Sequence, residues 1–196
     1  LVCKDGLSAD AIRWVQAQKA DGMGIDAPPR EITAKFMGGA TPWSFEADIA
    51  FPCATQNELD AEMAQSLIDG GCICVAEGAN MPLTEDAATL LRNAGIMHLP
   101  GKAANAGGVA VSGLEMSQNS HRRFMSADDV DAALRTIMSD IHDRVAEEGR
   151  GNGTIHYARD ANHAGKPLLA VAIVTKVLLQ KQDMYQSSTT KTAPTT

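Results

Sequence analysis

Residues 100–115 have the sequence Pro100-Gly-Lys-Ala-Ala-Asn-Ala-Gly-Gly-Val-Ala-Val-Ser-Gly-Leu-Glu115, and this run of small residues decides the fold. The apolar residues 95–99 before it are predicted to form a short buried strand, and residues 115–123 after it a helix. Glycine lets a backbone approach a ligand closely, and open α/β sheets bind ligands where a strand ends ahead of a helix. The segment is therefore predicted to be a ligand-binding loop, with a plain glycine-rich connection as the alternative.

Two more pairs of strand and helix are predicted upstream of this loop. Strands are expected at residues 48–52 and 72–76, because each is a short apolar run, and Pro52 ends the first. Asn57 and Thr84 are the predicted N-caps of the two helices. Strands and helices that alternate with short connections predict an α/β fold with a partial doubly wound, Rossmann-like parallel sheet. Strands that are apolar throughout are expected when helices cover both faces of such a sheet.

Helices flank this alternating region. Ser8 is the predicted N-cap of a helix over residues 9–20, and Ser126 is the predicted N-cap of a long helix. Residues 166–180 are predicted to form a final helix, whose apolar run is far shorter than the ~20 residues that a membrane span needs. The predicted organisation is a partial nucleotide-binding domain at residues 1–125, C-terminal helices that complete it at 126–181, and a disordered tail at 182–196.

Composition narrows the classes of function. The chain has 196 residues, of which 44% are hydrophobic and 21% charged, an ordinary composition for one globular domain. The net charge of -7 argues against nucleic acid and against an anionic membrane surface as partners. The 4 cysteines lack the paired spacing of zinc ligands, so buried, reduced thiols in a cytoplasmic protein are expected. The 5 histidines are scattered, and no metal site is predicted.

Polar side chains follow three consecutive predicted strands, in the segments 52–57, 77–82 and 100–115. Because the carboxyl ends of parallel strands meet at one edge of a sheet, these side chains are expected to converge on one crevice. They include no obvious pair of nucleophile and base, so they suit holding a ligand better than acyl transfer, and no catalytic residue is assigned. For each residue by itself, local capping of its loop is the alternative. The residues are Thr55, Gln56, Asn80, Asn105 and Ser112.

Three segments together resemble one known family. They are Asp48-Ile-Ala-Phe-Pro-Cys-Ala-Thr-Gln-Asn-Glu-Leu59, Ala76-Glu-Gly-Ala-Asn-Met-Pro82 and residues 100–116. These segments resemble glutamate dehydrogenases, most of all the hexameric, NADP-linked type, and they occur in the family's order and spacing. The likeness covers residues 1–165. The related leucine, valine and phenylalanine dehydrogenases are expected to differ at Thr55-Gln56-Asn57.

The resemblance implies reversible oxidative deamination of L-glutamate to 2-oxoglutarate and ammonia, with NADP or NAD as the cofactor. It also implies a cytoplasmic homo-oligomer, a hexamer in the full-length enzyme. By motif position, Ala54 and Thr55 are implied to lie along the nicotinamide ribose, with Gln56 nearby. Asn80 is implied to contact the nicotinamide end, and Asn105 to lie between the cofactor and the substrate.

The substrate side is implied to consist of Val109 and Ser112. Ser112 is expected at the start of a helix, where its hydroxyl would bond the distal carboxylate of the substrate and the helix dipole would favour that anion. Lys102 is interpreted as a loop charge without a catalytic role.

The family's substrate domain, with its catalytic lysine and aspartate, has no counterpart in this sequence, and neither has its glycine-rich pyrophosphate turn. The chain is therefore interpreted as the carboxyl-terminal part of the enzyme and is expected to be inactive alone. One rival is a dehydrogenase of another amino acid, for which an apolar residue would suit the substrate better than Ser112. Another is a non-catalytic nucleotide-binding remnant, which a start codon near Leu1 would favour.

Overall fold

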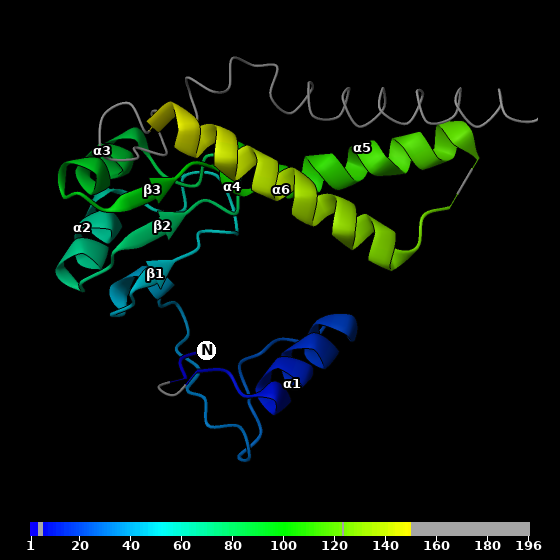
Figure 1. Cartoon of the computed structure of the whole chain (residues 1–196). Helices are drawn as coiled ribbons and strands as arrows, with labels where there is room; N and C mark the ends of the chain where they lie inside the picture. The colour runs from blue at the N-terminus through cyan, green and yellow to red at the C-terminus, as the bar shows by residue number, and fades with distance from the viewer. Residues whose placement is uncertain (4–5, 123, 150–196) are drawn as a thin grey trace, which may run out of the picture. The chain divides into compact units, whose positions relative to one another are not determined.

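The computed structural model describes residues 1–3, 6–122 and 124–149 (Figure 1). The chain divides into two compact units, Leu1–Ser44 and a second one that begins at Phe45. Each unit is described by itself. The predicted helix over residues 166–180 and the predicted tail lie outside the described residues, and the division at residues 125 and 181 stays a prediction.

The first unit contains helix α1 (Ala9–Ala20) and the short 3-10 helix η1 (Pro42–Ser44). The hydroxyl of Ser8 accepts a hydrogen bond from the N–H of Ala11 at 3.1 Å, which confirms the predicted N-cap. Val2 forms an isolated antiparallel bridge with Lys35. The buried apolar residues of this unit are few: Ala11, Ile32 and Trp43.

The second unit is built on a parallel sheet of β1 (Ile49–Ala50), β2 (Cys74–Ala76) and β3 (Met97–Leu99), in the order β1-β2-β3. Ala50 pairs with Val75, and Val75 with His98. Helices α2 (Ala61–Asp69) and α3 (Glu85–Asn93) connect the strands and pack on each other (Figure 1). This arrangement confirms the predicted α/β class with a parallel, Rossmann-like sheet.

The start of α2 differs from the prediction. Asp60, and not Asn57, is its N-cap and accepts a hydrogen bond from the N–H of Met63 at 2.9 Å. The physical reason is Leu59, which is fully buried and bridged to Leu83, so that the helix begins only after this residue. The predicted cap of α3 is confirmed, because the hydroxyl of Thr84 accepts from the N–H of Ala87.

The central small-residue segment is helical, so its prediction as a loop is wrong. Helix α4 (Gly101–Ala104) includes Lys102, which was expected in that loop, and α5 (Ala106–His121) follows after Asn105. Helix α5 packs on α6 (Ala127–Gly149), whose predicted N-cap Ser126 accepts from the N–H of Asp129 at 3.1 Å. The small side chains are needed for that packing, which places Ala106 and Ala110 against Ile137 and Ile141.

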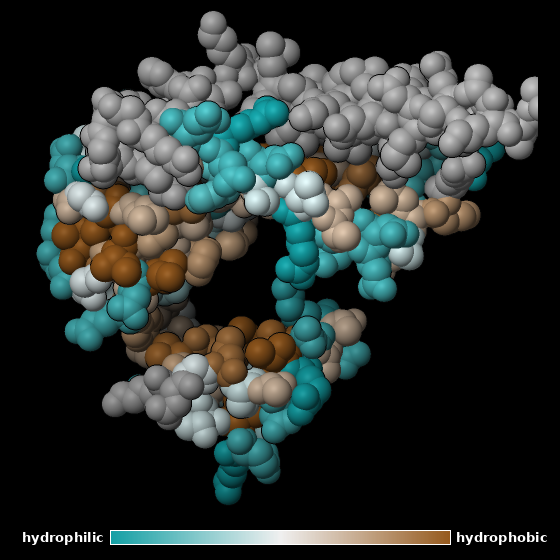
Figure 2. Space-filling view, viewed as in Figure 1, coloured by the Kyte–Doolittle hydropathy of each residue, from teal (hydrophilic) through white to brown (hydrophobic). Residues whose placement is uncertain are grey.

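One face of the sheet is exposed among the described residues. Ala50 and Val75 are 5% and 0% exposed, whereas Ile49, Phe51 and Met97 are 48%, 61% and 50% exposed. Figure 2 shows hydrophobic residues gathered on the visible surface of this unit. The short apolar runs therefore identify the strands correctly.

Candidate functional site

An open crevice of about 650 Å³ lies at the carboxyl ends of the three strands. Segments from all three strand ends line it, as expected for ligand sites in open α/β sheets. All seven residues predicted from the sequence for cofactor or substrate lie in its lining. The lining also includes four residues that were not assigned to cofactor or substrate from the sequence. The full lining is Cys53, Ala54, Thr55, Gln56, Gly78, Ala79, Asn80, Asn105, Gly108, Val109 and Ser112.

The segment after β1 forms one wall of the crevice. Its backbone is held locally, because the N–H of Ala54 donates to Oε1 of Glu58 at 2.9 Å. The side chains of Thr55 and Gln56 are exposed. Cys53 is an exposed free thiol, which differs from the expectation of buried cysteines. The Cys53 thiol explains why residue 78 is a glycine, because a Cβ at that position would lie 2.3 Å from the Cys53 sulfur.

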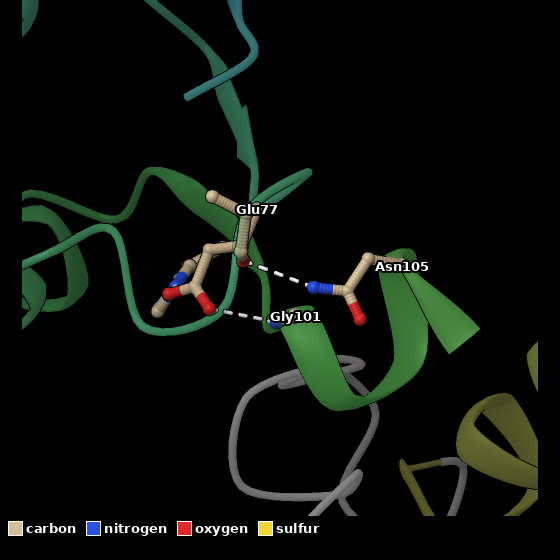
Figure 3. Close-up of polar contacts among 5 residues, drawn as sticks. Glu77, Gly101 and Asn105 are labelled. Atoms are coloured by element: carbon tan, nitrogen blue, oxygen red, sulfur yellow. Dashed lines mark hydrogen bonds and ion pairs between the residues drawn. The ribbon is translucent and has the colours of Figure 1, made fainter. Parts of the chain in front are cut away.

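The segments after β2 and β3 form the second wall, and Asn105 joins them. Its Nδ2 donates to the carbonyl of Ala79 at 2.9 Å and to Oδ1 of Asn80 at 3.0 Å. Figure 3 shows the amide nitrogen of Asn105 directed toward the end of β2. Because an amide nitrogen carries only two hydrogens, Oδ1 is the polar atom of Asn105 that is left for a ligand.

Helix α5 closes the third side with Gly108, Val109 and Ser112. Ser112 lies in the middle of α5 and is exposed, so the expectation that it begins a helix is wrong. The helix dipole therefore no longer favours an anion at this hydroxyl, since that effect is confined to the first turn. Val109 is 53% exposed and gives this side an apolar patch.

A buried hydrogen-bonded pair of a glutamate and a histidine lies beneath the second wall. Oε1 of Glu77 lies 2.7 Å from Nε2 of His98. Oε2 of Glu77 accepts from the N–H of Gly101 at 2.7 Å (Figure 3). Burial raises the pKa of the Glu77 carboxyl, but the hydrogen bonds from His98 and Gly101 and the charge of Lys102 outweigh burial and hold that pKa below its ordinary range. Sequence reasoning missed this pair, although a glutamate directly after an apolar strand is a usable signal.

The crevice offers neutral polar groups, since its lining includes no Asp, Glu, Lys, Arg or His. Such a surface suits amides and hydroxyls. Among the described residues, no three His, Cys, Asp or Glu side chains gather as metal ligands would. Within this same part of the chain, no helix is long and apolar enough to cross a membrane.

A parallel α/β sheet with a crevice at its strand ends defines the fold of this chain as Rossmann-like. Residues 1–175 match the family described as Glutamate/Leucine/Phenylalanine/Valine dehydrogenase. The chain belongs to this family.

Named relatives and a solved structure agree with that assignment. The chain is 48% identical over 174 residues to the glutamate dehydrogenase of Bacteroides thetaiotaomicron, covering 88% of this chain and 39% of that protein. It is 50% identical over 147 residues to the NADP-specific glutamate dehydrogenase of Salmonella typhimurium, covering 75% and 33%. The crystal structure of Plasmodium falciparum glutamate dehydrogenase matches with a TM-score of 0.76 at 34% identity, covering 91% and 38%. Some similar relatives are named NADP-specific glutamate dehydrogenases, and others are named NAD-specific.

Proposed function

We propose that the chain is the carboxyl-terminal part of a glutamate dehydrogenase, which interconverts L-glutamate with 2-oxoglutarate and ammonia using NADP or NAD. The observation that carries this proposal is the convergence of the three family-like segments on one crevice. The chain spans 33% to 39% of the length of the relatives named above, so the reaction belongs to a longer polypeptide.

The crevice fits the nicotinamide end of such a cofactor. Ala54, Thr55 and Gln56 would lie along the nicotinamide ribose, because their wall offers exposed hydroxyl and amide groups. Asn80 and Asn105 would meet the nicotinamide from the second wall. The neutral lining favours an amide and sugar hydroxyls over the charged pyrophosphate, for which a basic or helix N-terminal site would be expected.

The substrate would lie on the α5 side of the crevice, against Val109 and Ser112. The hydroxyl of Ser112 would donate to the distal carboxylate, and Val109 would contact the aliphatic part of the side chain. When bound, the cofactor supplies hydride acceptance or donation at the substrate α-carbon. The residues of this chain bind and orient the two molecules, and the groups that move protons would lie outside it.

An assay of the full-length polypeptide that carries this chain tests the function. Reductive amination is followed by the nicotinamide absorbance with 2-oxoglutarate, ammonia and the reduced cofactor. We expect turnover that requires all three, and we expect Asn80→Ala to raise the KM for the cofactor by up to about tenfold, as loss of one hydrogen bond predicts.

Asn93→Ala is the matched control, because Asn93 is also an exposed asparagine but lies on α3, outside the crevice lining. Its kinetics should equal those of the unsubstituted enzyme. Faster oxidation of leucine, valine or phenylalanine than of glutamate would contradict the proposed substrate and favour a dehydrogenase of another amino acid. A lack of cofactor binding would contradict the proposed class of reaction.

Two further features belong to this proposal and rest on the family likeness. One is assembly of the full-length enzyme as a homohexamer, which light scattering of the purified protein measures. The other is a cytoplasmic location, with which the four free cysteines agree, since thiols persist in reducing compartments.

A further inference from the structure

The turn that begins α4 is tied to the end of β2 through side chains as well as backbone. Oε2 of Glu77 accepts from the N–H of Gly101, the first residue of α4. The N–H of Asn105 donates to the carbonyl of Gly101 at 2.9 Å, so Glu77 and Asn105 hold the same helical turn from its two ends. A Cβ at Gly101 would lie 2.9 Å from Nδ2 of Asn105 and 3.2 Å from Oε2 of Glu77, which shows how closely the three residues pack.

Building on the proposed function, we propose that Glu77 is a positioning residue for the nicotinamide side of the crevice and acts through Gly101 and Asn105. Glu77 does not line the crevice, so it does not touch the ligands itself. Its carboxylate fixes the N-terminus of α4, and that turn in turn fixes the amide of Asn105 against Ala79 and Asn80. A ligand that binds Oδ1 of Asn105 therefore meets an acceptor whose direction is set by Glu77.

His98 completes the arrangement from β3. An ionised carboxylate only accepts hydrogen bonds, so Nε2 of His98 must carry the hydrogen in its 2.7 Å contact with Oε1. Nδ1 of His98 is buried without a hydrogen-bond partner. The imidazole is thus held to Glu77 alone, and it occupies one carboxylate oxygen so that the other remains aimed at Gly101. A carboxylate with both oxygens occupied has little freedom to rotate, which is what positioning requires.

Kinetics of the full-length enzyme test this role with three substitutions. Glu77→Ala removes both hydrogen bonds, and Glu77→Asp keeps the charge but is too short to reach Gly101 and His98 together. We expect both to lower kcat by about ten- to a hundredfold, because small misplacements of orienting groups have effects of that size. Glu77→Asp carries the test alone if Glu77→Ala does not fold.

Asp60→Ala is the matched structural control. Asp60 is likewise a carboxylate that accepts a backbone N–H at a helix start, but it caps α2 and does not line the crevice. It should lower the melting temperature while leaving kcat and KM unchanged. If Glu77→Asp behaves in the same way, with unchanged kcat, Glu77 is a structural residue only and the positioning role is overturned.

A double substitution asks whether Glu77 acts through Asn105. In an Asn105→Ala background, Glu77→Asp should change kcat by no more than about twofold, since the group it positions is already missing. If the kcat losses of the two single substitutions multiply in the double variant, Glu77 does not act through Asn105 and the proposed route is overturned. Failure of the proposed function is distinct from all of these outcomes, because it would appear as an absence of glutamate-dependent turnover in the unsubstituted enzyme.

Discussion

On the β1 side of the crevice, the side chains of Thr55 and Gln56 are exposed, and the N–H of Ala54 donates to the carboxylate of Glu58. On the β2 and β3 side, Asn105 donates both amide hydrogens, one to Ala79 and one to Asn80. The buried pair of Glu77 and His98 lies beneath this wall. In the first wall the polar side chains remain available to a ligand, whereas in the second wall most of them form hydrogen bonds within the wall. Substitutions in the first wall should therefore change ligand binding without changing stability. Substitutions in the second wall should change ligand binding and stability together.

Gly101→Ala should have the largest effect, because it disturbs the close packing of the second wall of the crevice. Its new methyl group would lie 3.0 Å from the carbonyl of Ala79, which is backbone and cannot move away cheaply. Overpacking of this kind costs about 1–3 kcal/mol, and activity should fall with stability. Urea unfolding beside steady-state kinetics measures both. If the variant has the unfolding free energy and the activity of the wild type, the second wall is not closely packed around Gly101.

Ser112→Ala should weaken use of glutamate and 2-oxoglutarate by about ten- to a hundredfold in kcat/KM, since a hydrogen bond to a charged group contributes about 1.5–3 kcal/mol. The cofactor Kd should barely change. Because Ser112 lies mid-helix, alanine should slightly raise the melting temperature. Ser120→Ala, another exposed serine of α5, is the control with normal kinetics. If both variants have normal kinetics, Ser112 does not contact the substrate.

Acid should destabilise the second wall of the crevice, which Glu77 supports. The folded pKa of Glu77 is lowered, so its carboxylate stabilises the protein above its unfolded pKa of about 4.3 and loses that contribution as the pH falls through the folded value. The difference in unfolding free energy between the wild type and Glu77→Gln should be greatest near pH 7 and should shrink below about pH 4.3. A difference that is constant from pH 7 to pH 3 would contradict this linkage.

Thr55→Ala should have the smallest effect on stability, within about 0.5 kcal/mol, because the side chain is exposed. It should nevertheless weaken cofactor binding by up to about tenfold. Thr136→Ala on α6 is a matched exposed threonine outside the crevice and should leave binding unchanged. Titration of cofactor fluorescence distinguishes them. Equal affinity for the two variants would remove Thr55 from the cofactor wall.

Local signals in the sequence were sufficient for the order of strands and helices. Short apolar runs gave the strands, and Ser8, Thr84 and Ser126 gave three helix starts, because a cap is formed within a few residues of itself. Asn57 failed as a cap because the extended pairing of Leu59 is a contact with a distant segment.

The remaining differences also come from contacts that are distant in sequence. Residues 100–115 have poor intrinsic helix preference at their glycines, but packing of α5 on α6 overrides it, and Gly107 allows Leu134 to approach. The convergence of the three polar segments followed from the strand order, since parallel strands end at one edge. The pair of Glu77 and His98 did not follow, because register and side-chain direction decide it.

Gly108→Ala tests most directly whether ligands occupy this crevice against α5. Gly108 lines the crevice, and outside the backbone of its own helix a Cβ there would meet no protein atom within 4 Å, so the new methyl group enters the space assigned to the ligands. Gly107→Ala is the control, because its methyl group would face Leu134 and Met138. We predict that Gly108→Ala raises the free energy of unfolding by up to about 1 kcal/mol, as alanine does in helices, and lowers kcat/KM at least tenfold. A more stable enzyme with unchanged kcat/KM would contradict the account.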